Sequence, residues 1–221
     1  MRKFATPLLA AALGLGPLAA VAEPVPTDGD HAAMSPLRRA AVSAELFEQA
    51  LAERDPLLAL AAASLRRTVF GTEVAREPER DGPVPEGAAE PPVGWEDMLD
   101  TAVALAPGDP TIEGLADDMR MARTKGVVSG KVYSISQIGA GGEDTYRPLE
   151  YEGNAYAEVY VEGRGPADIN VEVFDSAGKL VCSDTDISSI AYCGWRPIVN
   201  DTFAVVVMNG GEETSYTLIT N

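Results

Sequence analysis

Residues 156–162 read YAEVYVE, and this stretch decides the fold of the C-terminal half. Apolar residues at 157, 159 and 161 alternate with tyrosine or glutamate at the positions between them. This is the period of a strand with one dry face and one wet face. Residues 169–173, INVEV, repeat the pattern. Two such strands predict a sheet that packs one side on a core and turns the other to water.

The stretches that follow add turns and further strands. Residues 175–178, DSAG, predict a hairpin turn, and residues 179–182 lead back from it. Residues 203–208, FAVVVM, are apolar on both faces, which is typical of a central strand. Residues 209–211, NGG, turn the chain into a last strand over 214–220. Seven or eight short strands separated by turn signals predict a β-sandwich.

Composition changes abruptly near Gly126. Residues 23–126 hold 19 alanines and no tyrosine, whereas residues 127–221 hold 7 alanines and all seven tyrosines. Alanine favours helices, and tyrosine favours strands. We therefore expect a segregated α+β protein, in which N-terminal α-helical hairpins precede an antiparallel β-sandwich of jelly-roll type. The expected parts are a signal peptide at 1–22, a helical region at 23–126 and the sandwich at 127–221.

Capping signals place the first two helices. Ser35-Pro36 and Asp55-Pro56 each put a capping side chain before a proline at the first helical position. The short connection between them predicts an antiparallel hairpin, with the second helix ending at Gly71. The expected buried stripes are Leu37, Ala40, Ala44, Phe47 and Leu51 on the first helix, and Leu58, Ala62, Leu65 and Val69 on the second.

A second pair of helices is expected after a break. Residues 76–94 contain five prolines and predict a linker or exposed loop. A third helix then covers 95–106, and Asp109-Pro110 opens a fourth with Ile112, Leu115, Met119 and Ala122 on one face. Residues 50–56 and 104–110 share the pattern A-L-A-x-x-D-P. This echo resembles a degenerate helical-hairpin repeat of tetratricopeptide type, although Asp-Pro is in itself a good helix start and convergent cap chemistry is the simpler explanation.

The N-terminus predicts export. Arg2 and Lys3 precede an apolar run over 4–21 that ends in Ala20-Val21-Ala22, the form of a secretory signal peptide. A retained membrane anchor is the alternative, but the run is short and contains Pro7 and Pro17. We expect cleavage after Ala22, a periplasmic or secreted protein, and no stable membrane span after signal removal.

Both cysteines lie in the exported part. In an oxidising compartment, Cys182 and Cys193 most simply form a disulfide bond. A redox or nucleophilic thiol would need C-x-x-C spacing or a neighbouring base, and the sequence has neither near them.

Residues 127–221 resemble a known bacterial family. The pattern consists of a strand over 167–175, the turn and strand 176–181, the acidic segment 184–186, and the final strand pair 201–207 and 216–218. These residues resemble the bacterial pre-peptidase C-terminal domain, a jelly-roll-like sandwich attached to many secreted proteins. The two cysteines and the CGWRP stretch at 193–197 depart from that family's pattern. The resemblance implies a non-catalytic module for secretion, solubility or binding to a polymer.

The sequence argues against enzyme chemistry. His31 is the one histidine and lies in an acidic leader, so a His-based triad is not expected. The stretch GAGG at 139–142 lacks the lysine and serine or threonine of a phosphate-binding loop and predicts a turn. The formal net charge of −17 argues against a nucleic-acid binder, because phosphate contacts need clustered cations. We expect no catalytic residue, no metal-ligating residue and no resident cofactor.

Two binding alternatives stay open. Asp184 and Asp186 offer hard oxygen ligands for Ca²⁺, with Asp175 or Asp201 joining them in the fold, although acidic turns are usually only solvated. Trp195 and Tyr192 beside Cys193 would form either an exposed platform for a polysaccharide or a cover on the core.

Three functions are consistent with these observations. The first is an exported non-catalytic protein that binds an envelope or secreted protein or polymer through a sandwich and a helical interaction segment. The second is a structural or solubilising accessory with no specific ligand. The third is a calcium- or glycan-binding module of an envelope or secreted assembly.

Overall fold

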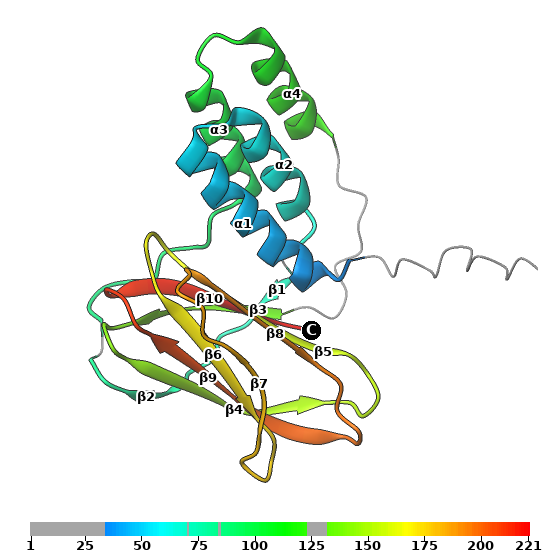
Figure 1. Cartoon of the computed structure of the whole chain (residues 1–221), viewed down its shortest axis with the longest axis vertical. Coiled ribbons are helices and arrows are strands. Elements are labelled where there is room, and N and C mark those ends of the chain that lie inside the picture. The colour runs from blue at the N-terminus through cyan, green and yellow to red at the C-terminus, as the bar shows by residue number, and fades with distance from the viewer. Residues whose placement is uncertain (1–33, 70, 84, 123–131) are drawn as a thin grey trace, which may run out of the picture. The chain divides into compact units, whose positions relative to one another are not determined.

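The computed structural model describes residues 34–69, 71–83, 85–122 and 132–221, and within them the chain is α+β (Figure 1). The helices are α1 (Pro36–Glu53), α2 (Pro56–Arg66), α3 (Trp95–Leu105) and α4 (Pro110–Met121). The strands are β1 (Thr72–Glu73), β2 (Glu79–Asp81), β3 (Val132–Ile138), β4 (Glu143–Tyr151), β5 (Ala157–Gly163), β6 (Ile169–Phe174), β7 (Leu180–Asp184), β8 (Ile190–Trp195), β9 (Asp201–Asn209) and β10 (Thr214–Thr220). The predicted signal peptide at 1–22, His31 and the predicted boundary at Gly126 lie outside the described residues.

The predicted helix starts are confirmed. Ser35 accepts a hydrogen bond from the backbone N–H of residue 38, Asp55 accepts from those of residues 57 and 58, and Asp109 accepts from those of residues 111 and 112. The predicted end of the second helix at Gly71 is wrong. The helix ends at Arg66, because the chain turns there and inserts Val69, which is fully buried, into a cluster with Ile219 of the sandwich.

The helices pack through small residues. Their shared core consists of Ala50, Ala59, Leu60, Ala62, Ala63, Met98, Leu99, Ala102, Ile112 and Ala116. Three residues expected on the buried stripes are exposed instead, namely Leu51 at 49%, Leu115 at 43%, and Ala122. Six of these ten core residues are alanines, which allow helix backbones to approach closely, whereas Leu51 and Leu115 point away from the core.

The predicted jelly-roll sandwich is confirmed. One sheet has the strand order β1-β3-β10-β5-β8, and the other has β2-β4-β9-β6-β7. Strands β3, β4, β5 and β6 alternate between the sheets, β7 pairs with β6 in the same sheet, and β8, β9 and β10 alternate again. This is the double Greek-key arrangement of a jelly roll. The core between the sheets is lined by residues such as Val159, Val171, Val205 and Leu218, all fully buried.

Residues 72–94 do more than link two parts. β1 pairs in parallel with β3, and β2 pairs antiparallel with β4, so this segment extends one edge of each sheet. Arg80 of β2 approaches Asp144, with 3.5 Å between Nε and Oδ1, and donates to Ser136 Oγ at 2.6 Å. Most of the segment is irregular, as its prolines predict. It nevertheless adds an edge strand to each sheet, and the unpaired backbone N–H and C=O groups of such an edge can pair with another strand.

The opposite edge carries the disulfide. Cys182 of β7 and Cys193 of β8 are bonded, which confirms the predicted pair, and the two strands belong to different sheets. Asp184 of β7 also accepts a hydrogen bond from the backbone N–H of Tyr192 in β8 at 2.8 Å. A covalent bond and a hydrogen bond therefore join the two sheets along this edge.

The predicted wet face of β5 is wrong. Glu158 is 3% exposed and Tyr160 is fully buried, because α1 packs on β5 and β8 over this face. Residues 34–221 accordingly form one compact unit. We call β1-β3-β10-β5-β8 the covered sheet and β2-β4-β9-β6-β7 the open sheet.

Among the described residues, no helix has the length and apolar character needed to cross a membrane.

Candidate functional site

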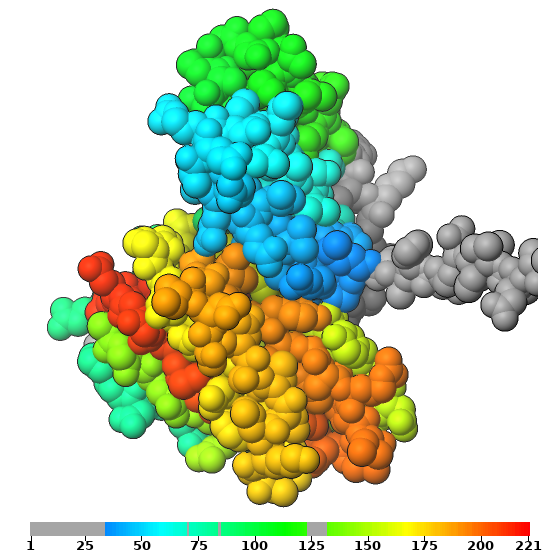
Figure 2. Space-filling view, viewed as in Figure 1, coloured from blue at the N-terminus to red at the C-terminus, as the bar shows by residue number. Residues whose placement is uncertain are grey.

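The outer face of the open sheet is the candidate site. Strand β9 lies at its centre, between β4 and β6. Its inward side chains Phe203, Val205 and Val207 are buried in the core, whereas the outward ones are half-buried. These outward residues, Thr202, Ala204, Val206 and Met208, form a mainly apolar line on the surface of the sheet. Figure 2 shows residues of β6 and β7, in yellow, at the surface.

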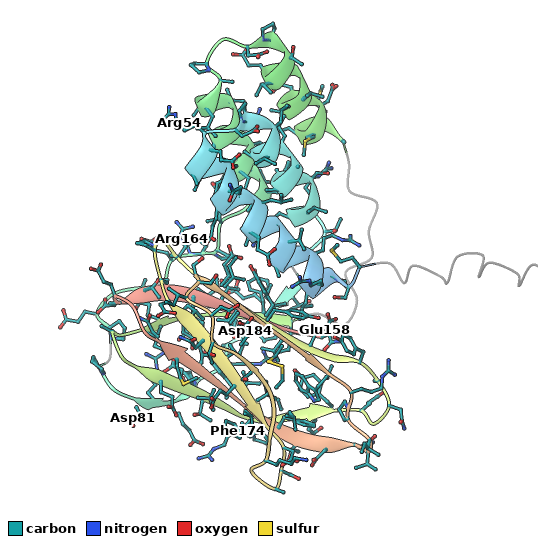
Figure 3. All side chains as sticks on the ribbon, viewed as in Figure 1. Arg54, Asp81, Glu158, Arg164, Phe174 and Asp184 are labelled. Atoms are coloured by element: carbon teal, nitrogen blue, oxygen red, sulfur yellow. A yellow bond between two sulfur atoms is a disulfide. The ribbon has the colours of Figure 1, made fainter. Side chains whose placement is uncertain are left out.

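The strand register places a polar row on either side of this line. Met208 lies between Glu143 of β4 and Asn170 of β6. Val206 lies between Thr145 and Glu172, one step along. Ala204 pairs with Phe174, which Figure 3 labels on the outer part of β6. We call this surface the open-sheet trough: its floor is Thr202, Ala204, Val206 and Met208, and its sides are Glu143, Thr145 and Arg147 of β4 and Asn170, Glu172 and Phe174 of β6.

The dimensions of the trough follow from sheet geometry. Neighbouring strands lie about 4.8 Å apart, so its two sides are about 10 Å apart. The floor from Thr202 to Met208 is about 20 Å long at about 3.3 Å per residue. Two hollows lie along it. One of about 600 Å³ contains Phe174, Arg147 and Val206, and one of about 420 Å³ contains Glu143, Glu172 and Met208. The trough is therefore long, narrow and open to solvent.

The charges of the trough are mainly negative. Four carboxylates line the two hollows, those of Glu79, Glu143, Glu172 and Asp175, against the single guanidinium of Arg147. Arg147 donates to both carboxylate oxygens of Glu79, with 3.0 Å from Nε to Oε1. These hydrogen bonds lower the pKa of Glu79 and raise the pKa of Arg147. The lining therefore offers carboxylate acceptors and a guanidinium held in one orientation.

The structure does not gather the carboxylates proposed as calcium ligands. Asp175 accepts hydrogen bonds from the backbone N–H groups of Ala177 and Lys179 in its hairpin turn. Asp184 accepts a hydrogen bond from the backbone N–H of Tyr192 in β8, and Asp201 accepts one from the backbone N–H of Thr202. A hydrogen bond with Ser176 also lowers the pKa of Asp201. Within the part of the chain that the structure describes, no three Asp, Glu, His or Cys residues lie close enough to hold a metal ion. Asp186 therefore joins no such group either.

Trp195 covers the core and does not form an exposed platform. It is 9% exposed, and its ring centroid lies 5.0 Å from that of Tyr151 and 5.3 Å from that of Phe203. Tyr192 points to the other face of β8, where its hydroxyl donates to Glu158 at 2.6 Å. Of the two arrangements expected from the sequence, the cover on the core is the one observed.

Sequence reasoning missed the trough, although a signal was present. The stretch 203–208 is apolar on both faces and predicted a central strand, which is correct. The inward face is buried in the core, whereas the outward apolar residues are only half-buried. The signal in the sequence is the set of apolar residues on the outward face of 203–208, together with Phe174 at the end of β6.

Comparison with family models and with curated proteins gives no match. Among solved structures, the chain is similar to the Yersinia pseudotuberculosis-derived mitogen, with 15% identity, a TM-score of 0.32, and coverage of 42% of this chain and 85% of that chain. It is also similar to the C-terminal CBM6 of LamC, a marine laminarinase from Zobellia galactanivorans, with 10% identity, a TM-score of 0.26, and coverage of 38% and 76%.

Proposed function

We propose that this chain is an exported, non-catalytic binding protein whose open-sheet trough holds an uncharged glycan chain. The proposal rests on one observation: Ala204, Val206 and Met208 form a half-exposed apolar floor between two mainly polar rows of side chains. Binding sites for small ligands combine an apolar lining with a few polar groups that fix orientation. The trough has this composition in an elongated form.

The chemistry of a sugar chain matches this lining. A pyranose ring has faces of C–H groups and a rim of hydroxyls. Lying flat on the floor, it would bury a C–H face on Val206 and Ala204, while its hydroxyls reach Glu172, Thr145 and Arg147 at the sides. Carboxylate and guanidinium groups supply several acceptors and donors each, which suits hydroxyls that can do both.

Other polymers fit less well. An extended peptide gains affinity by adding a strand to a sheet edge, whereas the trough is a sheet face that offers side chains only. Nucleic acid and anionic polysaccharides are disfavoured by the four carboxylates against one cation. An uncharged glycan avoids this repulsion.

The location and family assignment belong to the same proposal. The signal-like residues 1–22 support export, and the disulfide is compatible with an extracytoplasmic protein. The resemblance of residues 127–221 to the pre-peptidase C-terminal domain supports a non-catalytic module. The helices α3 and α4, which extend beyond the hairpin that covers the sheet, provide a surface for a second partner.

The test is titration calorimetry against soluble uncharged polysaccharides and their oligosaccharides. Val206→Asp and Phe174→Ala should each weaken binding about ten-fold or more, because a buried apolar contact at the centre of a site carries much of its energy. Leu57→Ala, on an exposed residue of α2, is the matched control and should bind as the natural protein does. Absence of binding to every uncharged glycan, or equal binding by Val206→Asp, would refute the proposal.

A further inference from the structure

An exposed apolar pair stands at one end of the sandwich, in the loop between β8 and β9. Ile198 is 85% exposed and Val199 is 65% exposed. We call these two residues the apolar tip. In Figure 1 this loop, in orange, lies at the same end of the sandwich as the β6–β7 turn. Two adjacent branched apolar side chains this exposed are a more informative feature than a single exposed leucine.

The loop that carries the tip is firmly held. Pro197 is buried, and its carbonyl accepts a hydrogen bond from the N–H of Asn154 at 2.7 Å. The Asn200 side chain accepts from the N–H of Gly153 at 2.9 Å. Arg196 donates to the carbonyl of Asn154 at 2.5 Å. The residues on both sides of the tip are thus tied to the β4–β5 loop.

Close packing adds to this restraint. A Cβ atom at Gly153 would lie 2.6 Å from the backbone Cα and carbonyl carbon of Val199, so the two loops touch at the backbone. Collapse of the tip onto the protein surface is prevented by these contacts. The loop's hydrogen bonds and backbone contacts hold two apolar side chains in water in one orientation. Such preorganisation lowers the entropic cost of binding.

The surroundings of the tip are mainly acidic, although Arg196 is exposed two residues before Ile198. Glu150, Glu152 and Asp201 line a hollow of about 570 Å³ together with Asn200, the residue that follows the tip. Glu150 and Glu152 are exposed. The chain as a whole carries a formal net charge of −17. A second copy would bring the same acids together, and an anionic bilayer would repel them, so charge disfavours both occupants.

We propose that the apolar tip docks into an apolar pocket, rimmed by lysine or arginine side chains, on a partner protein. Ile198 and Val199 enter the pocket, and Glu150 and Glu152 face its basic rim. Neither Ile198 nor Val199 lines the open-sheet trough, although Thr202 lines both the trough and the hollow beside the tip. The protein would therefore hold a glycan with its sheet and a protein with its tip. The tip proposal does not depend on the glycan proposal.

The probe is an amphipathic leucine–lysine peptide, with a leucine–glutamate peptide of the same pattern as its charge control. The natural protein should bind the first and not the second. Ile198→Ser/Val199→Ser should weaken binding about ten-fold or more, because the anchoring side chains carry most of the energy of an interface. Leu51→Ser/Leu57→Ser, a matched exposed pair on the helices, should leave binding unchanged. Glu150→Gln/Glu152→Gln should weaken binding and flatten its dependence on salt.

Three results would overturn the proposal. They are no binding of the leucine–lysine peptide, equal binding by the tip variant, and stronger binding to phosphatidylcholine or phosphatidylglycerol vesicles than to the peptide. The last result would assign the tip to a membrane. Thermal unfolding of the tip variant checks that its fold is retained. Glycan titration of the same variant separates the two sites, because the trough should be unaffected.

Discussion

Arg66 of α2 donates two hydrogen bonds to the carboxylate of Glu162 in β5, at 2.5 Å from Nη1 and 3.1 Å from Nη2. The Arg66 side chain is fully buried, and it also donates from Nε to Ser43 at 3.1 Å. Burial lowers the pKa of Arg66, but the charges of Glu162 and Tyr160 and the hydrogen bonds to them together raise it by more, so the guanidinium stays charged. Tyr160 donates to the same carboxylate at 2.6 Å. One ion pair thus joins the helical layer to the covered sheet.

Removing one partner of this pair should be costly. Arg66→Met should lower the free energy of unfolding by about 3–5 kcal/mol, because Glu162 is left as a buried charge without its cation. Denaturant unfolding measures this loss. Arg120→Met is the control: Arg120 pairs with Asp100 and Asp117 at the surface, where ion pairs contribute about 1 kcal/mol or less. A loss at Arg66 as small as that at Arg120 would contradict this account.

The same pair has a second expected outcome. Arg66→Met/Glu162→Leu should recover most of the stability lost in the single variant, since replacing both members of a buried pair with apolar residues is often neutral. Tyr160 loses its acceptor in the double variant, so recovery should be incomplete. A double variant less stable than Arg66→Met alone would show that the two residues do not act as a pair.

The disulfide should contribute to stability through the unfolded chain. Cys182→Ala/Cys193→Ala should lower the free energy of unfolding by about 2–4 kcal/mol, because the crosslink limits the freedom of the unfolded state. Reduction of the natural protein with dithiothreitol should give a similar loss. The double variant should not respond to the reductant, which makes it the control. Free thiols in the native protein before reduction would contradict the bonded pair.

Local signals made much of the fold predictable. The caps at Ser35, Asp55 and Asp109 act on backbone groups two or three residues away, so the sequence shows both donor and acceptor. Alternation and turn residues likewise predicted the sandwich and the central position of β9. Strands β1 and β2, of two and three residues, have no period to detect, and only their pairing with β3 and β4 defines them.

The faces of the two sheets depend on contacts that are remote in sequence. Glu158 and Glu162 predicted a wet face, yet their partners Ser35 and Arg66 lie 123 and 96 residues away. The trough is the opposite case. The apolar residues of β9 predicted a central strand, but the described helices pack on the other sheet and the outward residues of β9 stay half-buried. The alternation of apolar and polar residues along each strand is visible in the sequence. Which sheet face the helices cover depends on packing between residues that are far apart in the chain.

Alkaline pH should destabilise the protein through its tyrosines. Burial raises the pKa of six of the seven tyrosines above the usual value, namely Tyr133, Tyr146, Tyr151, Tyr160, Tyr192 and Tyr216. An acid whose pKa is raised by folding holds its proton longer in the folded state than in the unfolded state. Its stabilising effect is therefore complete below the unfolded value near 10 and is lost as pH rises above it.

Two optical measurements check this expectation. Tyrosinate absorbance should rise together with the loss of the circular dichroism signal as pH increases above about 10. Most phenols then ionise only when the protein unfolds. Ionisation of most tyrosines near pH 10, with the dichroism signal unchanged, would contradict the burial of these hydroxyls.

Gly153 and Gly114 should respond to the same substitution in opposite directions. Gly153→Ala should lower the free energy of unfolding by about 1–3 kcal/mol, because its methyl group would meet the backbone of Val199 at 2.6 Å and must displace a loop. Gly114 lies inside α4, and a Cβ there meets no atom within 4 Å. Gly114→Ala should therefore raise stability by about 0.5–1 kcal/mol, the helix propensity difference. Denaturant unfolding of both variants tests the close contact between the β4–β5 and β8–β9 loops. If Gly153→Ala were as stable as the natural protein, the loop that carries Ile198 and Val199 would have room to move, and the restraint on the apolar tip would be absent.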